Sequence, residues 1–166
     1  MARAGKARKA AARIKRRNGP LVIDFHTHIM VTDIAEIVQK RRPAKSPEYQ
    51  LIEGYRRGAR HHRSKHPRPG MDRLQARYAD MDKLGMDIHV VSGHVAQFCY
   101  WADGKLGLEV ARTGNDRLAE MCAADPDRFI GLGMVPLQDV GRAVRELERM
   151  VTKLGLRGVQ IGTFID

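Results

Sequence analysis

Short apolar runs with the length of buried strands alternate with stretches of helical periodicity along most of the chain. The runs lie at residues 21–25, 86–92, 129–135 and 158–162. Four buried strands joined by three crossovers make a parallel α/β array, because parallel strands need a long connection between them. The crossovers are expected to be right-handed. This alternation predicts either a barrel or a doubly wound sheet.

Amphipathic helices are expected between the runs. Leu74, Tyr78, Met81 and Leu84 have the spacing of one apolar helix face, and Gly85 stands where such a helix would end. Two more stretches, ending at Asp125-Pro126 and at Gly155, follow the same pattern. Their apolar positions are Leu108, Ala111, Leu118, Met121 and Cys122 in the first, and Val140, Ala143, Val144, Leu147, Met150, Val151 and Leu154 in the second.

The size of the strand–helix unit favours a (β/α)8 barrel of the TIM type. Such a barrel takes about 250 residues, so four strands provide roughly half of it. Residues 20–166 are therefore predicted to form the N-terminal half of a barrel, with about four βα units. Its first and fourth strands would be open apolar edges. We expect either a truncated chain or a half-barrel completed in a homodimer or by a second half-barrel chain.

Positive charge is concentrated in the first 70 residues, which hold 18 Lys and Arg against 5 Asp and Glu, whereas the rest hold 12 against 14. Residues 1–19 read as a basic, disordered arm, with a targeting peptide or a nucleic-acid tail as alternatives. Residues 30–70 read as a long irregular excursion, too polar to pack as a core, with a short helix near Asp33–Lys40. Because the excess charge lies outside the regular part, nucleic acid is not the expected partner.

Other features predict a cytoplasmic protein. No window approaches eighteen consecutive apolar residues, and no apolar signal region stands at the N-terminus, so neither a membrane span nor a secretory signal is expected. Cys99 and Cys122 are too few for a disulfide framework and lack the spacing of metal ligands. We expect two reduced thiols.

The strongest candidate for chemistry is His26-Thr27-His28, directly after the first apolar run. In an extended segment, residues i and i+2 project to the same side, so both imidazoles can reach one point. That point lies at the carboxyl end of the strand, where barrel enzymes place their sites. Two neutral imidazoles suit zinc, iron or nickel, and a catalytic site would add further His and carboxylate ligands. His26 and His28 are therefore predicted to be metal ligands.

Two further histidines lie near the second strand. His94 follows it, on the same rim as the predicted ligands, and is a candidate for substrate binding. His89 lies inside the strand, where a hydrogen-bonded core histidine is the better interpretation. The sequence contains no phosphate-binding loop and no dinucleotide fingerprint.

An ordered set of motifs resembles the amidohydrolase-related group of the amidohydrolase superfamily. The blocks are Ile23-Asp-Phe-His-Thr-His28, Met81-Asp82, Phe98-Cys-Tyr-Trp-Ala102, Asn115-Asp116, Arg128-Phe-Ile-Gly-Leu-Gly133, Val135-Pro-Leu-Gln138 and Gly158-Val-Gln-Ile-Gly-Thr163. They cover roughly residues 20–166. Within that superfamily the set is most similar to the aminocarboxymuconate-semialdehyde decarboxylase family.

The resemblance implies a distorted TIM barrel, often dimeric, that carries out non-oxidative decarboxylation with a divalent metal. Zn2+ is the metal expected first. It places His26 and His28 on the metal together with a His and an Asp from later strands, and it implies a further catalytic His. Those residues would lie after Asp166. The family also binds a substrate carboxylate with an arginine from the excursion, a role that Arg60 or Arg63 could fill.

The leading hypothesis is accordingly a carboxy-lyase acting on a small, aromatic-derived carboxylate. A metal-dependent hydrolase of the same superfamily, acting on an ester, lactone or amide, remains an alternative, because the same metal chemistry serves both reactions. An inactive fragment or a binding module completed by a partner is the alternative from a different class.

Overall fold

The computed structural model describes residues 19–39, 41 and 74–163 of the chain. Its centre is a parallel sheet in which the strands follow one another in chain order. The strands are β1 (Ile23–Ile29), β2 (Ile88–Gly93), β3 (Phe129–Gly133) and β4 (Gly158–Val159). A doubly wound sheet reverses its strand order at a switch point, whereas a barrel keeps one order. The described strands therefore have the arrangement of half a TIM barrel, as predicted.

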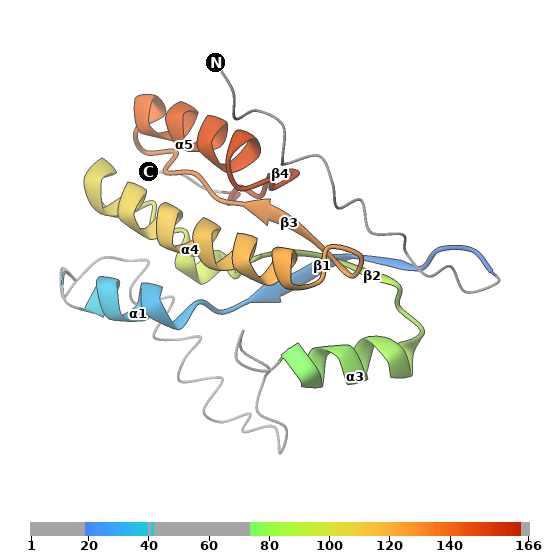
Figure 1. Cartoon of the computed structure of the whole chain (residues 1–166). Helices are drawn as coiled ribbons and strands as arrows, with labels where there is room; N and C mark the ends of the chain where they lie inside the picture. Colours follow the sequence, from blue (N-terminus) through green and yellow to red (C-terminus); the bar gives the residue numbers. More distant parts are fainter. Residues whose placement is uncertain (1–18, 40, 42–73, 164–166) are drawn as a thin grey trace.

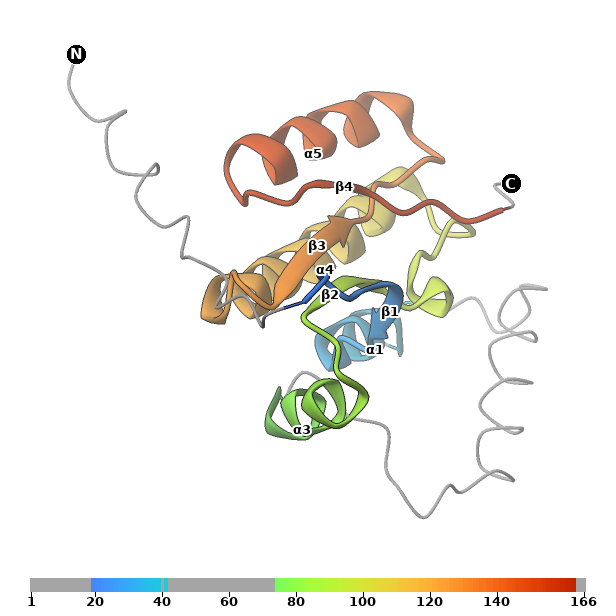
Figure 2. The same ribbon diagram turned by 90° about the vertical axis from the view of Figure 1, so that its right-hand side faces the viewer.

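Helices connect the strands and cover one face of the sheet. They are α1 (Thr32–Gln39), α3 (Leu74–Leu84), the short 3-10 helix η2 (Val95–Gln97), α4 (Gly104–Ala124) and α5 (Val140–Thr152). Figure 1 shows α1, α4 and α5 side by side, with α4 in contact with both neighbours. Figure 2 shows α4 behind β3 and α1 behind β1, while no described helix lies over the face turned to the viewer. Among these helices, none combines the length and hydropathy of a bilayer-spanning segment.

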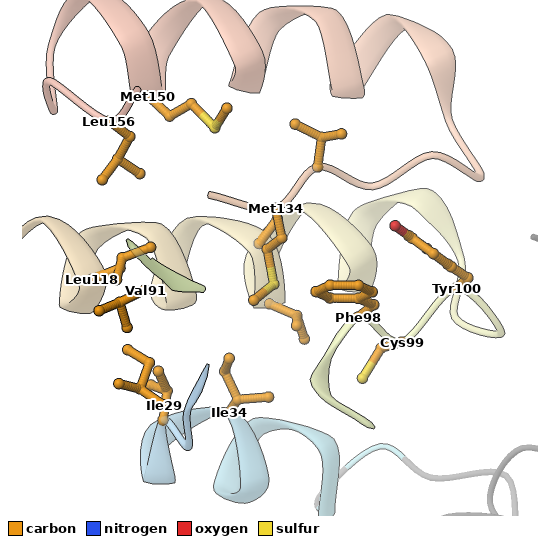
Figure 3. Packing of buried hydrophobic residues seen from close by; sticks show 14 of the residues in the cluster. Ile29, Ile34, Val91, Phe98, Cys99, Tyr100, Leu118, Met134, Met150 and Leu156 are labelled. Carbon is orange, nitrogen blue, oxygen red and sulfur yellow. The ribbon is translucent and has the colours of Figure 1, made fainter. Parts of the chain in front are cut away.

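The main core lies between this helix layer and the sheet. Figure 3 shows Ile29 and Ile34 below Val91 and Leu118, with Leu156 above them. Each such side chain contributes roughly 1.5–3 kcal/mol when fully buried.

Two glycines on β3 keep the helices close to the sheet. A Cβ at Gly131 would lie 2.6 Å from Leu156 Cδ2, and one at Gly133 would lie 2.5 Å from the sulfur of Met150.

A buried polar network joins α4, α5 and the end of β3. Asn115 donates to the carbonyl of Met134 (2.9 Å) and to Glu146 (2.8 Å), and its own carbonyl accepts the Met134 amide (2.8 Å). Arg149 donates to Glu146 through two nitrogens and to Asp116. Because Asn115 and Glu146 are fully buried, these partners are needed to offset their desolvation. The Asn115-Asp116 motif therefore has a structural role.

Several local predictions are confirmed. Gly85 and Gly155 adopt φ angles of 69° and 71°, the left-handed conformation that ends a helix. The structure adds two caps that were not predicted: Asp103 and Asp139 cap α4 and α5 by accepting backbone N–H groups of the first turn. His89 is a buried strand histidine with a hydrogen-bond partner, Arg77.

Other local predictions were wrong. The first strand does not end at Phe25 but continues through both histidines to Ile29, because the β1–β2 pairing resumes after a register shift between Asp24 and Thr27. Leu84 is not on the buried face of α3 and is 65% exposed.

At the start of the excursion, α1 lies where a short helix was expected. The expectation that this segment is too polar to pack was wrong there, because Val31 before α1 and Ile34 and Val38 on it are buried in the core. Residue 40 and residues 42–73 lie outside the described part of the chain.

The apolar residues of helix α5 were expected to be buried together, but the structure divides them between a buried face and an exposed face. Ala143 and Met150 face the core, but Val140 and Val144 are 74% and 59% exposed, and Leu147 and Val151 are exposed as well. The exposed four have the 4-3-4 spacing of a helix–helix seam. They form a surface called here the α5 seam.

Candidate metal centre

The second half of β1 brings His26 and His28 together at the carboxyl end of the sheet. Their Nε2 atoms are 3.1 Å apart. Two nitrogens that each lie about 2.0–2.1 Å from one zinc ion, at tetrahedral to octahedral angles, are separated by about 2.8–3.4 Å. Without an ion, one ring has to donate its Nε2–H to the other. The pair therefore has the spacing of two donors that share one ion or one proton.

His28 is fixed by its surroundings. Its Nδ1 lies 3.1 Å from the hydroxyl of Ser92 on β2, so a neutral ring can keep Nε2 free for a metal. Burial lowers the pKa of His28, and the nearby rings of His26 and His94 lower it further. A metal ligand has to be neutral, so a lowered pKa favours metal binding near neutral pH.

His26 is more loosely held. Its side chain is exposed, and its backbone N–H donates to the carboxylate of Asp24 at 3.1 Å. This hydrogen bond bridges the register shift of β1 and helps to orient the backbone of His26. Asp24 therefore supports the backbone of the site.

His94 comes to the same place from the loop after β2. Its ring centroid lies 5.6 Å from that of His28. The Nδ1 atom accepts the backbone N–H of Ala96, which makes His94 the N-cap of η2. In the neutral ring the proton then lies on Nε2. His94 is thus a hydrogen-bond donor beside the histidine pair.

A buried glutamine joins the two loops of the site. The side chain of Gln97 accepts the Val31 N–H (3.0 Å) and donates to the Val31 carbonyl (2.7 Å). These two bonds tie the turn after β1 to η2, so His28 and His94 are held on adjoining segments.

The structure joins only part of the predicted site. His26, His28 and His94 are neighbours, whereas Arg60 and Arg63 lie outside the described residues. Within the ranges 19–39, 41 and 74–163, no third His, Cys, Asp or Glu joins the pair in a metal-binding group.

Three supporting residues, Ser92, Arg77 and Gln97, were not predicted from the sequence. Ser92 could have been found from strand register, because it stands opposite His28 in the β1–β2 pair. Arg77 donates to the backbone carbonyl of His28 from α3, and no local pattern signals such a contact.

Comparison with known proteins identifies the family of the chain. The profile of the Amidohydrolase family (Amidohydro_2) matches residues 23–164. A 2-amino-3-carboxymuconate-6-semialdehyde decarboxylase of Dictyostelium discoideum is 37% identical over 90 residues, which cover 54% of this chain and 25% of that protein. The chain therefore belongs to the amidohydrolase family.

Solved structures of decarboxylases share the fold. The 5-carboxyvanillate decarboxylase of Sphingomonas paucimobilis aligns with a TM-score of 0.70 and 28% identity, over 88% of this chain and 44% of that one. A dihydroxybenzoic acid decarboxylase of Polaromonas, solved with bound manganese and the inhibitor 2-nitroresorcinol, aligns with a TM-score of 0.59 and 28% identity, over 87% and 39%. The chain thus spans less than half the length of these proteins.

Proposed function

We propose that this chain carries the first two metal ligands of a metal-dependent, non-oxidative decarboxylase of small, aromatic-derived carboxylates. The observation that carries the proposal is the 3.1 Å separation of the His26 and His28 Nε2 atoms at the carboxyl end of β1. The similarity to decarboxylases of 5-carboxyvanillate and dihydroxybenzoic acid supports this reaction class over hydrolysis.

The proposed cofactor is a divalent metal, with Zn2+ the first choice. Paired imidazoles suit zinc, whereas manganese prefers oxygen ligands. Manganese is nevertheless bound in the related Polaromonas enzyme, so the additional ligands would decide the preference. A bound divalent ion would supply a Lewis acid for the oxygen atoms of the substrate.

The described residues would then orient the substrate and keep the ligands in place. Ser92 holds the ring of His28, and His94, whose ring lies 5.6 Å from that of His28 between centroids, is proposed to contact an oxygen of the carboxylate or phenol. In the reaction, the bond between the ring carbon and the carboxylate breaks, CO2 leaves, and a proton takes its place on the carbon. No oxidant or reductant is needed. Arg60 or Arg63 is proposed to bind the carboxylate.

Completion of the site is part of the proposal, because two imidazoles leave a catalytic metal undercoordinated. We propose that a second half-barrel segment supplies the remaining His and Asp ligands, because a homodimer of this chain would instead bring two histidine pairs into one barrel. The exposed apolar side chains of β1 and of the α5 seam support completion by further elements. Phe25, for example, is 72% exposed on β1, which is an edge strand of the described sheet. Such surfaces are normally covered by neighbouring elements.

A cytoplasmic location also belongs to the proposal. The two free cysteines support it, since Cys99 is buried and Cys122 is half-buried without a disulfide.

A decarboxylation assay tests the proposed function. The protein, in its assembled form, would be loaded with Zn2+ or Mn2+ and incubated with 5-carboxyvanillate and with 2,6-dihydroxybenzoate, and CO2 release would be followed. Turnover that disappears in His28→Ala and on chelation is the expected result. Hydrolysis of an ester or lactone without CO2 release from any carboxylate would overturn the carboxy-lyase assignment in favour of the hydrolase.

A further inference from the structure

Arg77 joins α3 to both strands of the site through one guanidinium. One terminal nitrogen donates to the main-chain carbonyl of His28 at 2.8 Å, and the other lies 3.3 Å from Nδ1 of His89 on β2. The side chain is half-buried, and this burial lowers the pKa of Arg77, while the charges of Asp24 and Asp80 offset part of that effect. Helix α3 would form without this hydrogen bond. The contact of Arg77 with the carbonyl of the proposed metal ligand His28 therefore calls for another explanation.

The backbone around His28 is where β1 needs support. In the described sheet β1 has a strand neighbour on one side only, and its pairing with β2 shifts register between Asp24 and Thr27. The regular ladder is therefore interrupted at residues 25–26 and resumes only at Thr27, the residue before His28. Irregular pairing leaves the direction of a side chain less firmly set. A hydrogen bond from a charged guanidinium is shorter and stronger than one between neutral groups.

We infer that Arg77 is a positioning residue for the metal ligand His28: it fixes the backbone of that residue while Ser92 fixes its ring. This inference rests on the proposed function. The two contacts hold His28 at its carbonyl and at Nδ1 and leave Nε2 directed at His26. Groups that orient a ligand in this way typically change metal affinity by about 10–100-fold when they are removed.

His89 in turn aims Arg77. Its Nδ1 can accept the guanidinium N–H only in the neutral ring, and burial first, then the charge of Arg77, lower the pKa of His89. The fork of an arginine can reach two acceptors in different directions, whereas a lysine offers a single charged nitrogen. Arginine is therefore the side chain that this geometry requires.

The chain contains a matched control, Arg128. It also joins α3 to the segment before β2, donating to Asp82 and to the carbonyl of Met86 at 3.0 and 3.1 Å, but its described contacts do not include β1. Arg77→Met and Arg128→Met both remove a guanidinium from the α3 junction. Only the first removes the support of His28.

The test is a titration of the full-length protein with Co2+, followed by visible absorption, together with denaturant unfolding. Arg77→Met is expected to weaken Co2+ binding about tenfold or more and to change the absorption bands. Arg128→Met should alter the unfolding midpoint but leave affinity and bands unchanged. In the metal-free protein, Arg77→Met should also speed amide hydrogen exchange at Thr27–Ile29. Arg77→Lys, a milder change, should weaken binding severalfold and keep the unfolding midpoint.

The outcomes separate this inference from the proposed function. If Arg77→Met and Arg77→Lys match the unsubstituted protein in affinity and bands while His28→Ala loses Co2+, the positioning role is refuted and the metal site stands. Equal losses of affinity in the Arg77 and Arg128 variants would also refute it, since they would show a general effect of stability. If His28→Ala binds as tightly as the unsubstituted protein, the metal site itself is refuted.

Discussion

The side chain of Asn115 on α4 forms a two-way hydrogen-bonded pair with the backbone of Met134, at 2.8 and 2.9 Å, directly after β3. We predict that Asn115→Leu destabilises the protein by about 2–4 kcal/mol, because it removes the Asn115 partner of the buried Met134 N–H and carbonyl and one of the hydrogen bonds of Glu146. Denaturant unfolding would measure this. Thr152→Ala, which removes one exposed hydroxyl contact to Glu148, should cost less than about 0.5 kcal/mol. Equal effects of the two substitutions would contradict the structural role.

The α5 seam predicts self-association of the isolated chain. Val144 and Leu147 are exposed, whereas Met150, on the neighbouring core-facing side of the helix, is fully buried. Val144→Lys combined with Leu147→Lys should reduce aggregation measured by light scattering and leave the unfolding midpoint nearly unchanged. Met150→Lys should prevent folding, since it buries a charge in the core. A stable monomer before any substitution would argue against an uncovered seam.

Burial of Cys122 predicts that its thiol reacts slowly with alkylating reagents. Burial raises the pKa of Cys122 to about 11, against an ordinary value of 9.0. At pH 8 the thiolate fraction is then about a hundredfold lower than in the unfolded chain. Alkylation with iodoacetamide, followed by peptide mass analysis, should label Cys122 at least a hundredfold more slowly in the folded protein than in urea. Comparable rates would mean that the thiol is not buried.

The same shift has a consequence for stability. The folded state keeps the proton to higher pH than the unfolded state, so the unfolded state binds fewer protons as pH rises from about 9 to 11. The stabilising effect of the neutral thiol is therefore complete below pH 9 and declines above it. Cys122→Ala should flatten that part of the pH–stability curve.

The basic arm is predicted to be dispensable for folding. The match to the family begins at residue 23, after the arm and the Gly19-Pro20 breaker. We expect deletion of residues 2–18 to leave the melting temperature and metal binding unchanged. A fall of several degrees, measured by calorimetry, would show instead that the arm docks on the barrel.

The order of strands and helices could be predicted because each element carries its own apolar periodicity. The end of β1 could not, since His26, Thr27 and His28 are polar and read as a strand exit, whereas their backbone still pairs with β2. The double apolar face of α5 was visible in the sequence, but which half meets the core depends on the position of α4. Arg77 was beyond prediction for a related reason, because its partner is a backbone carbonyl 49 positions away.

The account depends most on one claim, that a single divalent ion binds between His26 and His28. Equilibrium dialysis of the protein in its assembled form against Zn2+ or Mn2+, followed by elemental analysis, measures it directly. We predict about one ion per site in the unsubstituted protein and in His94→Ala, whose ring does not belong to a metal-binding group in the described part of the chain. His26→Ala and His28→Ala should each retain almost none. Full occupancy in both of these variants would contradict the account.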